Sequence, residues 1–273
     1  MSKKWTSFFA VLGLVQMDAD GLFGQKSALH QESLKWAEHL RKRGAKLVVF
    51  PEGSSTGYVT NQNVWCRAEQ GQRCENRHCH PIEPVAENVP SGATTQAWLR
   101  WSSQAGVSVV FWIPERDGNR YFNTTVGVNP DGTWVRYRKR DLYKYDRCWA
   151  DAGNASQVFD TPIGRFGLLT CLDASDRNGR YYAEYRAKKV QAVLISMDWD
   201  ESAKGKRSAR RMMEAKAQEV GLPLGVADQS AWDGTGVYLP DRQKRLREEG
   251  LPENAVGQAG GVLGGWNSPP GGP

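Results

Sequence analysis

The chain has 273 residues, of which 40% are hydrophobic and 24% charged, and its formal net charge is +6. This composition is that of a globular protein and excludes a disordered chain. The length allows one large domain or two small ones with a substantial core. The basic residues are scattered among acidic ones without an RNA- or DNA-reading motif, so we expect no nucleic-acid partner. No apolar run reaches the ~20 residues of a membrane span, so we expect no membrane partner.

Short apolar strands alternate with amphipathic helices along the chain. The N-terminus, with two lysines and an apolar stretch, is compatible with a signal peptide, but we favour a first buried strand there. Strands are expected at 8–16, 46–50, 107–115, 121–128, 134–139, 158–161, 164–171, 192–197 and 222–228. Helices are expected at 27–43, 93–105, 179–189 and 203–220. This alternation predicts a layered α/β domain, which we place at residues 1–255.

Two segments differ from this pattern. Residues 60–92 are polar and rich in Cys, His and Pro, which predicts a long loop or an insertion. Residues 256–273 are rich in Gly and Pro, which predicts a flexible tail.

Three of the expected strands are followed by one chemically reactive side chain each: Glu52 after "LVVFP", Lys139 after "WVRYR" and Cys171 after "FGLLT". Taken singly, they are explained as a turn residue, a surface lysine and a small core residue. Together they can perform hydrolysis. A thiol has an ordinary pKa of about 8.5 and needs a base, which Glu52 provides, while a lysine can stabilise an oxyanion.

The sequence resembles the nitrilase superfamily of carbon–nitrogen hydrolases, whose members use a Glu–Lys–Cys triad. The resemblance is carried by "GAKLVVFPEGSSTGY", "VRYRKRDL" and "VFDTPIGRFGLLTCLD", around Glu52, Lys139 and Cys171 in the family's order. The later segments "AVLISMDW" and "AQEVGLPLGVADQSAWDGTGVYLPD" extend it over roughly residues 8–240. The resemblance implies a four-layer α-β-β-α sandwich and a homo-oligomer.

It also implies a mechanism without a metal or an organic cofactor. Cys171 would attack an amide or N-carbamoyl carbon of a small-molecule substrate and form a thioester with release of ammonia or amine. Lys139 and the backbone N–H of Leu172 would stabilise the oxyanion, and Glu52 would activate water. By the same resemblance, Tyr58, Asp198 and Trp199 would bind substrate. Alternatives are nitrile hydrolysis, acyl transfer to an amine or alcohol, and a non-catalytic binding protein that retains the fold.

The chain departs from the family pattern at two places. Many members have a second glutamate a few residues beyond the lysine, where this chain has Asp146. Asp146 either fills that role or pairs with Lys144 or Arg147, and the sequence leaves both readings open. After the cysteine the family usually has Cys-Tyr-Asp with an Arg and a Pro, whereas this chain reads "CLDASDRNGR".

Basic residues near the expected strand ends suggest a substrate preference. Arginine can hold a carboxylate through two parallel hydrogen bonds, so the sequence suggests carboxylate-bearing amides or N-carbamoyl amino acids. The alternative is that these cations face solvent and pair with nearby aspartates. The residues are Arg140, Lys144, Arg147, Arg177 and Arg180.

The other cysteines and their neighbouring histidines allow three interpretations. A zinc site is one, although the spacing fits no common zinc finger. Disulfide bonds are the second, and unligated loop residues are the third. We expect a cytoplasmic protein, which favours the third interpretation. The residues are Cys66, Cys74, His78, Cys79, His80 and Cys148.

Overall fold

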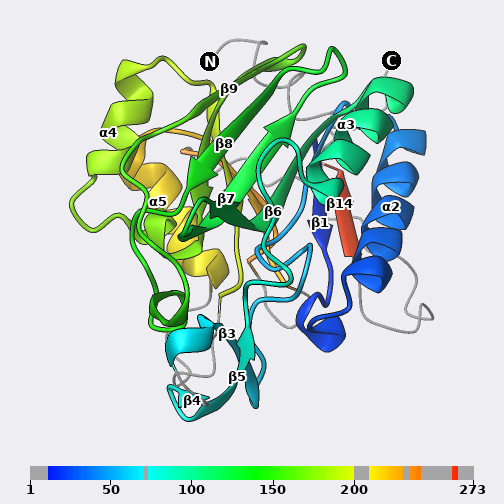
Figure 1. The fold of residues 1–273 in the computed structure, drawn as a ribbon. Helices are drawn as coiled ribbons and strands as arrows, with labels where there is room; N and C mark the ends of the chain where they lie inside the picture. The colour runs from blue at the N-terminus through cyan, green and yellow to red at the C-terminus, as the bar shows by residue number, and fades with distance from the viewer. Residues whose placement is uncertain (1–11, 71–72, 200–208, 230–233, 241–259, 264–273) are drawn as a thin grey trace, which may run out of the picture.

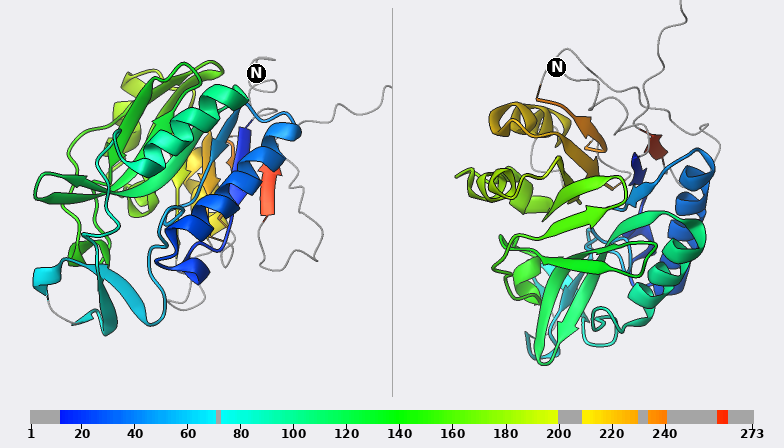
Figure 2. Two further views of the ribbon diagram at one scale, coloured as in Figure 1. Left: turned by 45° about the vertical axis from the view of Figure 1, so that its right-hand side comes forward. Right: turned by 90° about the horizontal axis from the view of Figure 1, so that it is seen from above.

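Two β-sheets pack face to face, and each has two helices on its outer side (Figures 1 and 2). The computed structural model describes residues 12–70, 73–199, 209–229, 234–240 and 260–263. The first sheet has the strand order β14 (Gly260–Leu263), β1 (Leu12–Gln16), β2 (Leu47–Val49), β6 (Ser108–Asp117), β7 (Arg120–Val128), β8 (Trp134–Arg138). The second has the order β13 (Gly236–Tyr238), β12 (Leu224–Ala227), β11 (Ala192–Ser196), β10 (Gly164–Thr170), β9 (Val158–Thr161).

The helices complete a four-layer α-β-β-α sandwich, as predicted. Helices α2 (Lys26–Lys42) and α3 (Ala93–Ala105) cover the first sheet, and α4 (Arg180–Ala187) and α5 (Ala209–Val220) cover the second (Figure 2). None of the helices in the described ranges has the length and apolar composition needed to cross a membrane. The predicted strand 8–16 and helix 203–220 are described only from residues 12 and 209 onward.

The continuous apolar run of β2 is explained by burial on both faces. Successive side chains of a strand point to opposite sides, so Leu47 and Val49 enter the core between the sheets. Val48 and Phe50 pack instead toward α2 and α3. A strand covered on both sides needs apolar residues at every position, and "LVVF" provides them.

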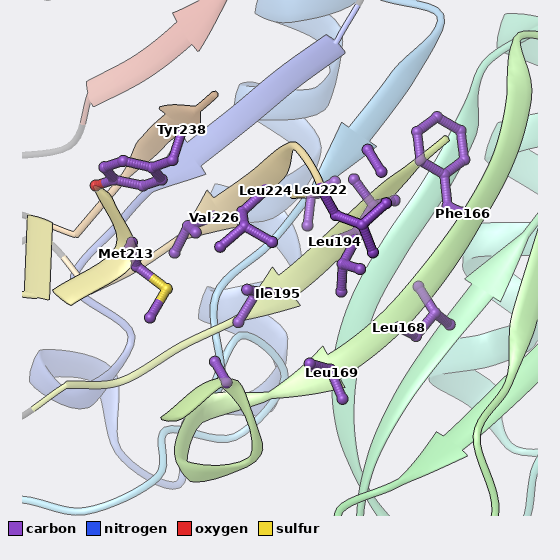
Figure 3. Close-up of a cluster of buried hydrophobic side chains, with 14 of the residues drawn as sticks. Phe166, Leu168, Leu169, Leu194, Ile195, Met213, Leu222, Leu224, Val226 and Tyr238 are labelled. Carbon is purple, nitrogen blue, oxygen red and sulfur yellow. The ribbon is translucent and has the colours of Figure 1, made fainter. Parts of the chain in front are cut away.

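The core of the second sheet fixes the strand that precedes Cys171. Figure 3 shows Leu168 of β10, Ile195 of β11 and Val226 of β12 within one buried cluster, which Met213 of α5 joins from outside. Phe166 lies at the start of β10 in the same cluster. This packing makes the strand ends rigid supports for polar side chains.

Hydrogen bonds between the sheets align the ends of their strands. The hydroxyls of Thr125 on β7 and Thr170 on β10 are 2.8 Å apart. Ser196 at the end of β11 donates to the carbonyl of Phe50 at 2.8 Å. The residues that follow β2, β10 and β11 are therefore held close to one another, although they come from different sheets.

Two of the predicted segments contain strands. The 60–92 region, predicted as a long loop or an insertion, contains a three-stranded sheet in the order β3 (Asn63–Cys66), β5 (Arg77–Pro81), β4 (Arg73–Cys74). We call residues 60–81 the insert. The predicted flexible tail contains β14, which pairs antiparallel with β1. The free edge of β1 offers unpaired backbone donors and acceptors, and Gly-rich sequence can pair with it in extended form.

Candidate active site

Glu52 lies in a tight turn directly after β2. Its side chain is fully buried, and its carbonyl accepts a 2.7 Å hydrogen bond from the Gln229 side chain. Gly53 follows with φ +84°, and a Cβ there would lie only 3.0 Å from the backbone nitrogen of Tyr58. Glycine is therefore required for the turn that directs Glu52 inward.

Lys139 lies between two carboxylates. It follows β8, and its Nζ is 3.0 Å from Glu52 Oε1 and 2.7 Å from Asp146 Oδ2, with all three side chains fully buried. Asp146 comes from the 3-10 turn η4 (Asp146–Cys148). Asp146 therefore occupies the position expected of a second acid, and its pairing partner is Lys139, not Lys144 or Arg147.

One amide joins the two carboxylates. Asn123 on β7 donates from Nδ2 to Glu52 Oε1 and to Asp146 Oδ1, both at 2.7 Å. Its Oδ1 accepts from Trp112 Nε1 at 2.5 Å, which fixes the orientation of the amide. Sequence reasoning missed Asn123, because it is one polar residue within a strand. The one signal in the sequence was a polar side chain within a strand whose neighbouring residues are buried, since a buried amide needs hydrogen-bond partners.

Burial and charge determine the protonation of this group. Two carboxylates and one ammonium leave one net negative charge in the protein interior. Burial raises the pKa of Glu52, the Lys139 charge partly opposes this, and Asp146 adds to the increase. Burial lowers the pKa of Lys139, but the charges of Asp146 and Glu52 outweigh it and hold that pKa well above its usual range. Lys139 thus stays cationic, while Glu52 is suited to exchanging a proton.

Cys171 begins the 3-10 turn η5 (Cys171–Ser175) that follows β10. It has φ +44°, an uncommon backbone conformation for a non-glycine residue, of the kind that is often found at functional sites. Its Sγ is buried and donates to the carbonyl of Asp198 at 3.4 Å. Burial raises the pKa of the Cys171 thiol, Glu52 raises it further, and Lys139 lowers it. The pairing of Thr170 with Ser196, and the hydrogen bond from Ser196 to the carbonyl of Phe50, hold the Cys171 turn and the Glu52 turn at the same end of the two sheets.

The predicted substrate-binding residues occupy different positions. Tyr58 is buried, and its hydroxyl donates to Asp146 Oδ1 at 2.9 Å, so its place is beneath the charged group. Asp198 is buried beside Cys171, and burial followed by the Asp20 carboxylate raises its pKa well above the usual range. Trp199 is half-buried, and its backbone nitrogen donates to Asp228. Leu172 follows Cys171 as the second residue of η5.

Of the five cations proposed to bind a carboxylate, three have other partners and two are exposed. Arg140 forms an ion pair with Glu184 at 2.7 Å. Lys144 lies over the ring of Tyr145, and Arg180 lies over the ring of Tyr181. Arg147 and Arg177 are exposed. These contacts give the predicted carboxylate preference no support.

The remaining cysteines form two disulfide bonds. Cys66 is joined to Cys79 within the insert, and Cys74 is joined to Cys148 of η4. The expectation of unligated cysteines was therefore wrong. Within the described ranges, no three His, Cys, Asp or Glu side chains are placed to hold a metal ion. The insert folds back onto η4, the turn that carries Asp146, and this places Cys74 beside Cys148. The spacing of the cysteines in the sequence did not reveal this pairing.

The sequence profile of the carbon-nitrogen hydrolase family matches residues 11–247. The chain belongs to the carbon-nitrogen hydrolase family. The chain is 29% identical over 160 residues to a nitrilase of Pyrococcus abyssi, covering 58% of this chain and 54% of that protein. It is 30% identical over 153 residues to an (R)-stereoselective amidase of a Pseudomonas species, covering 56% and 49%. The chain thus spans about half the length of the curated relatives that it matches.

Solved structures support the same fold. A carbon-nitrogen hydrolase superfamily protein of Xanthomonas campestris aligns with a TM-score of 0.67 at 18% identity, covering 92% of this chain and 88% of that chain. Nit3 of Saccharomyces cerevisiae aligns with a TM-score of 0.66 at 20% identity, covering 92% and 89%. These similarities confirm the predicted nitrilase-superfamily sandwich.

Proposed function

We propose that this protein is a cysteine-dependent hydrolase that cleaves a non-peptide C–N bond, in an amide or an N-carbamoyl compound, through a thioester intermediate. The observation that carries the proposal is the buried group of Glu52, Lys139 and Asp146 together with Cys171, the one free cysteine of the five. Strand pairing and the hydrogen bond from Ser196 to Phe50 hold Glu52 and Cys171 at the same strand ends. The names of the relatives, which include nitrilases and amidases, agree with C–N hydrolysis.

The first half of the reaction transfers the acyl group to sulfur. Glu52 accepts the thiol proton of Cys171 as sulfur attacks the carbonyl carbon. Lys139 and the backbone N–H of Leu172 stabilise the negative oxygen of the tetrahedral intermediate. The C–N bond then breaks, Glu52 returns its proton to the leaving nitrogen, and ammonia or amine departs.

The second half regenerates the thiol. Glu52 removes a proton from water, and the hydroxide attacks the thioester carbon. The C–S bond breaks, the proton returns to sulfur, and the carboxylic or carbamic acid departs. The raised pKa of Glu52 suits this use, because a base works best when its pKa is near the operating pH.

Ammonia release from a panel of amides, N-carbamoyl compounds and nitriles tests the proposal. We expect turnover of an amide or carbamoyl compound by the wild type and none by Cys171→Ala. Preferential turnover of nitriles would assign the chain to nitrile hydrolysis. Product formation only in the presence of an added amine or alcohol would indicate acyl transfer. Turnover of no compound would favour the non-catalytic alternative.

Assembly and compartment stay predictions from the sequence. Association into a homo-oligomer is tested by light scattering of the purified protein. The predicted cytoplasmic location is weakened by the two disulfides, because disulfides persist in oxidising compartments and are rare in the cytosol. Mass spectrometry of the protein from its native source, alkylated before lysis, would determine whether these cysteines are oxidised.

A further inference from the structure

Asp173 is a buried acid that the proposed chemistry does not use. It lies two residues after Cys171 in η5 and is fully buried. An acid without a reaction partner in such a place needs a structural explanation, because burying a carboxylate is unfavourable unless it is hydrogen-bonded.

The hydrogen bonds of the Asp173 carboxyl group all come from the segment that carries Lys139. Its Oδ1 accepts from the backbone nitrogen of Asp141 at 2.7 Å, and both oxygens are 3.3 Å from the backbone nitrogen of Arg140. Its Oδ2 accepts from the hydroxyl of Tyr137 at 2.8 Å. Tyr137 precedes Lys139 by two residues, and Arg140 and Asp141 follow it. One carboxyl group therefore contacts the chain on both sides of the lysine.

We propose that Asp173 is a positioning residue that joins the Cys171 turn to the Lys139 segment and so fixes the distance between thiol and ammonium. The two segments come from different sheets, since Lys139 follows β8 and Cys171 follows β10. The lysine side chain is long, and a small shift of its backbone would change its effect on the thiol. The expected effect on kcat rests on the proposed function, whereas the expected effect on the pKa of the Cys171 thiol does not.

A second buried acid in the same segment provides a matched control. Asp176 accepts hydrogen bonds from the backbone nitrogens of Arg180, Tyr181 and Tyr182, at the start of α4. Asp176 thus stabilises the helix that follows, whereas Asp173 contacts the segment across the sheets. The two residues are both buried aspartates, but their side chains bind different segments.

Different titratable groups surround the Asp173 carboxyl group and the Cys171 thiol. Asp173 lies near Lys139, Arg140, Tyr137 and the tyrosines of α4. Glu52, Lys139, Asp198 and Asp146 influence the Cys171 thiol, and of these only Lys139 favours the thiolate. Displacement of Lys139 should therefore raise the pKa of that thiol.

The experiment compares Asp173→Ala, Asp173→Asn and Asp176→Ala with the wild type. Asparagine keeps an oxygen for the Asp141 nitrogen and an N–H for the Tyr137 hydroxyl, so it should preserve the connection, whereas alanine removes it. We expect Asp173→Ala to lower kcat by about 10²-fold, the scale for a misplaced catalytic group, with KM little changed. Asp173→Asn should stay within a few-fold of the wild type, and Asp176→Ala should lower Tm but not kcat.

A second measurement needs no substrate. The pH midpoint of Cys171 alkylation by iodoacetamide, followed by mass spectrometry, reports the thiol pKa independently of accessibility. It should move upward in Asp173→Ala and stay at the wild-type value in Asp173→Asn and Asp176→Ala. An unchanged midpoint in folded Asp173→Ala overturns the inference, as does an equal shift in Asp176→Ala. A shifted midpoint in Asp173→Ala, found together with no hydrolase activity in the wild type, would support the positioning role while contradicting the proposed function.

Discussion

Asn123 places one neutral amide between two buried carboxylates, and its NH₂ group donates one hydrogen bond to each of them. An isosteric carboxylate there would add a third negative charge and remove both donors. The hydrogen bond from Asn123 lowers the pKa of Glu52, so the protonation of Glu52 depends on this neutral neighbour as well as on the charged ones.

Asn123→Asp is therefore predicted to be nearly inactive. The additional charge should raise the pKa of Glu52 further, and the loss of two hydrogen bonds should free its side chain. We expect kcat/KM to fall by at least ~10²-fold, comparable to the loss of one oxyanion donor. Steady-state kinetics at several pH values measures it. Wild-type activity at neutral pH would show that Asn123 is dispensable.

Lys139→Met keeps the length of the side chain and removes its charge. If Lys139 stabilises the oxyanion, kcat should fall by at least ~10²-fold. The variant also leaves Glu52 and Asp146 without their shared cation, so circular dichroism must confirm that it is folded. A folded variant with kcat near the wild-type value would exclude this role.

The positions of the three candidate catalytic residues at strand ends were predictable, because each one follows a strand within a recognisable motif. Glu52 and Lys139 form a buried ion pair that Asp146 joins, and Cys171 follows β10, while their catalytic roles stay a prediction. Asn123 and Asp173 were not predictable, because their roles depend on contacts between segments that are distant in sequence. The contact of the Tyr58 hydroxyl with Asp146 was equally out of reach of the sequence, and its substrate-binding role stays a prediction.

At the scale of elements, the insert is tied to the body of the protein at several points. Besides the Cys74–Cys148 disulfide, the backbone nitrogen of Arg67 donates to the carbonyl of Cys148 at 3.1 Å. The Arg67 guanidinium donates to the carbonyl of Trp149 at 2.8 Å. Three short strands have too small a core to be stable alone, and these connections compensate for it.

Removal of the longer crosslink should cost more stability than removal of the shorter one. The double variant Cys74→Ser with Cys148→Ser opens a separation of 74 residues, and Cys66→Ser with Cys79→Ser opens one of 13. Chain entropy predicts a difference of ~1.5 kcal/mol in the free energy of unfolding. Urea unfolding of both variants measures it. A greater loss in the Cys66/Cys79 variant would contradict the entropic explanation.

The helices and the central strands were predictable from periodicity, because burial on one or both faces imposes a pattern. The small sheet of the insert and β14 were not. Strand β4 has two residues, too few for a period, and β14 is Gly-rich and gains its partner only from the edge of β1.

At the scale of the whole molecule, buried acids link stability to pH. Burial raises the pKa of Asp20 and of Asp173 to about 7 each. An unfolded aspartate has a pKa of about 3.9, so between pH 4 and 7 the folded state binds more protons than the unfolded state. The stabilising contribution of these groups to the free energy of unfolding is therefore fully present below pH 4 and is lost as the pH rises to 7. The lowered pKa of His30 acts in the opposite direction below pH 6.5.

Comparison with Asp173→Asn isolates one of these groups. Asparagine cannot ionise, so relative to the wild type the variant should gain stability as the pH rises from 5 to 8. The gain is at most about 3 kcal/mol, from ~1.4 kcal/mol per pKa unit. Urea unfolding of both proteins at pH 5, 6.5 and 8 measures the difference. A difference that stays constant with pH would show that Asp173 does not titrate in this range.

The two disulfides interleave along the chain, because Cys74 lies between Cys66 and Cys79, and Cys79 lies between Cys74 and Cys148. Four cysteines can pair in three ways, and oxidation in the order of synthesis would join Cys66 to Cys74 first. That pairing must be exchanged before the insert can dock. In an oxidising compartment, the yield of active protein should therefore depend on disulfide isomerase activity, and not only on an oxidant.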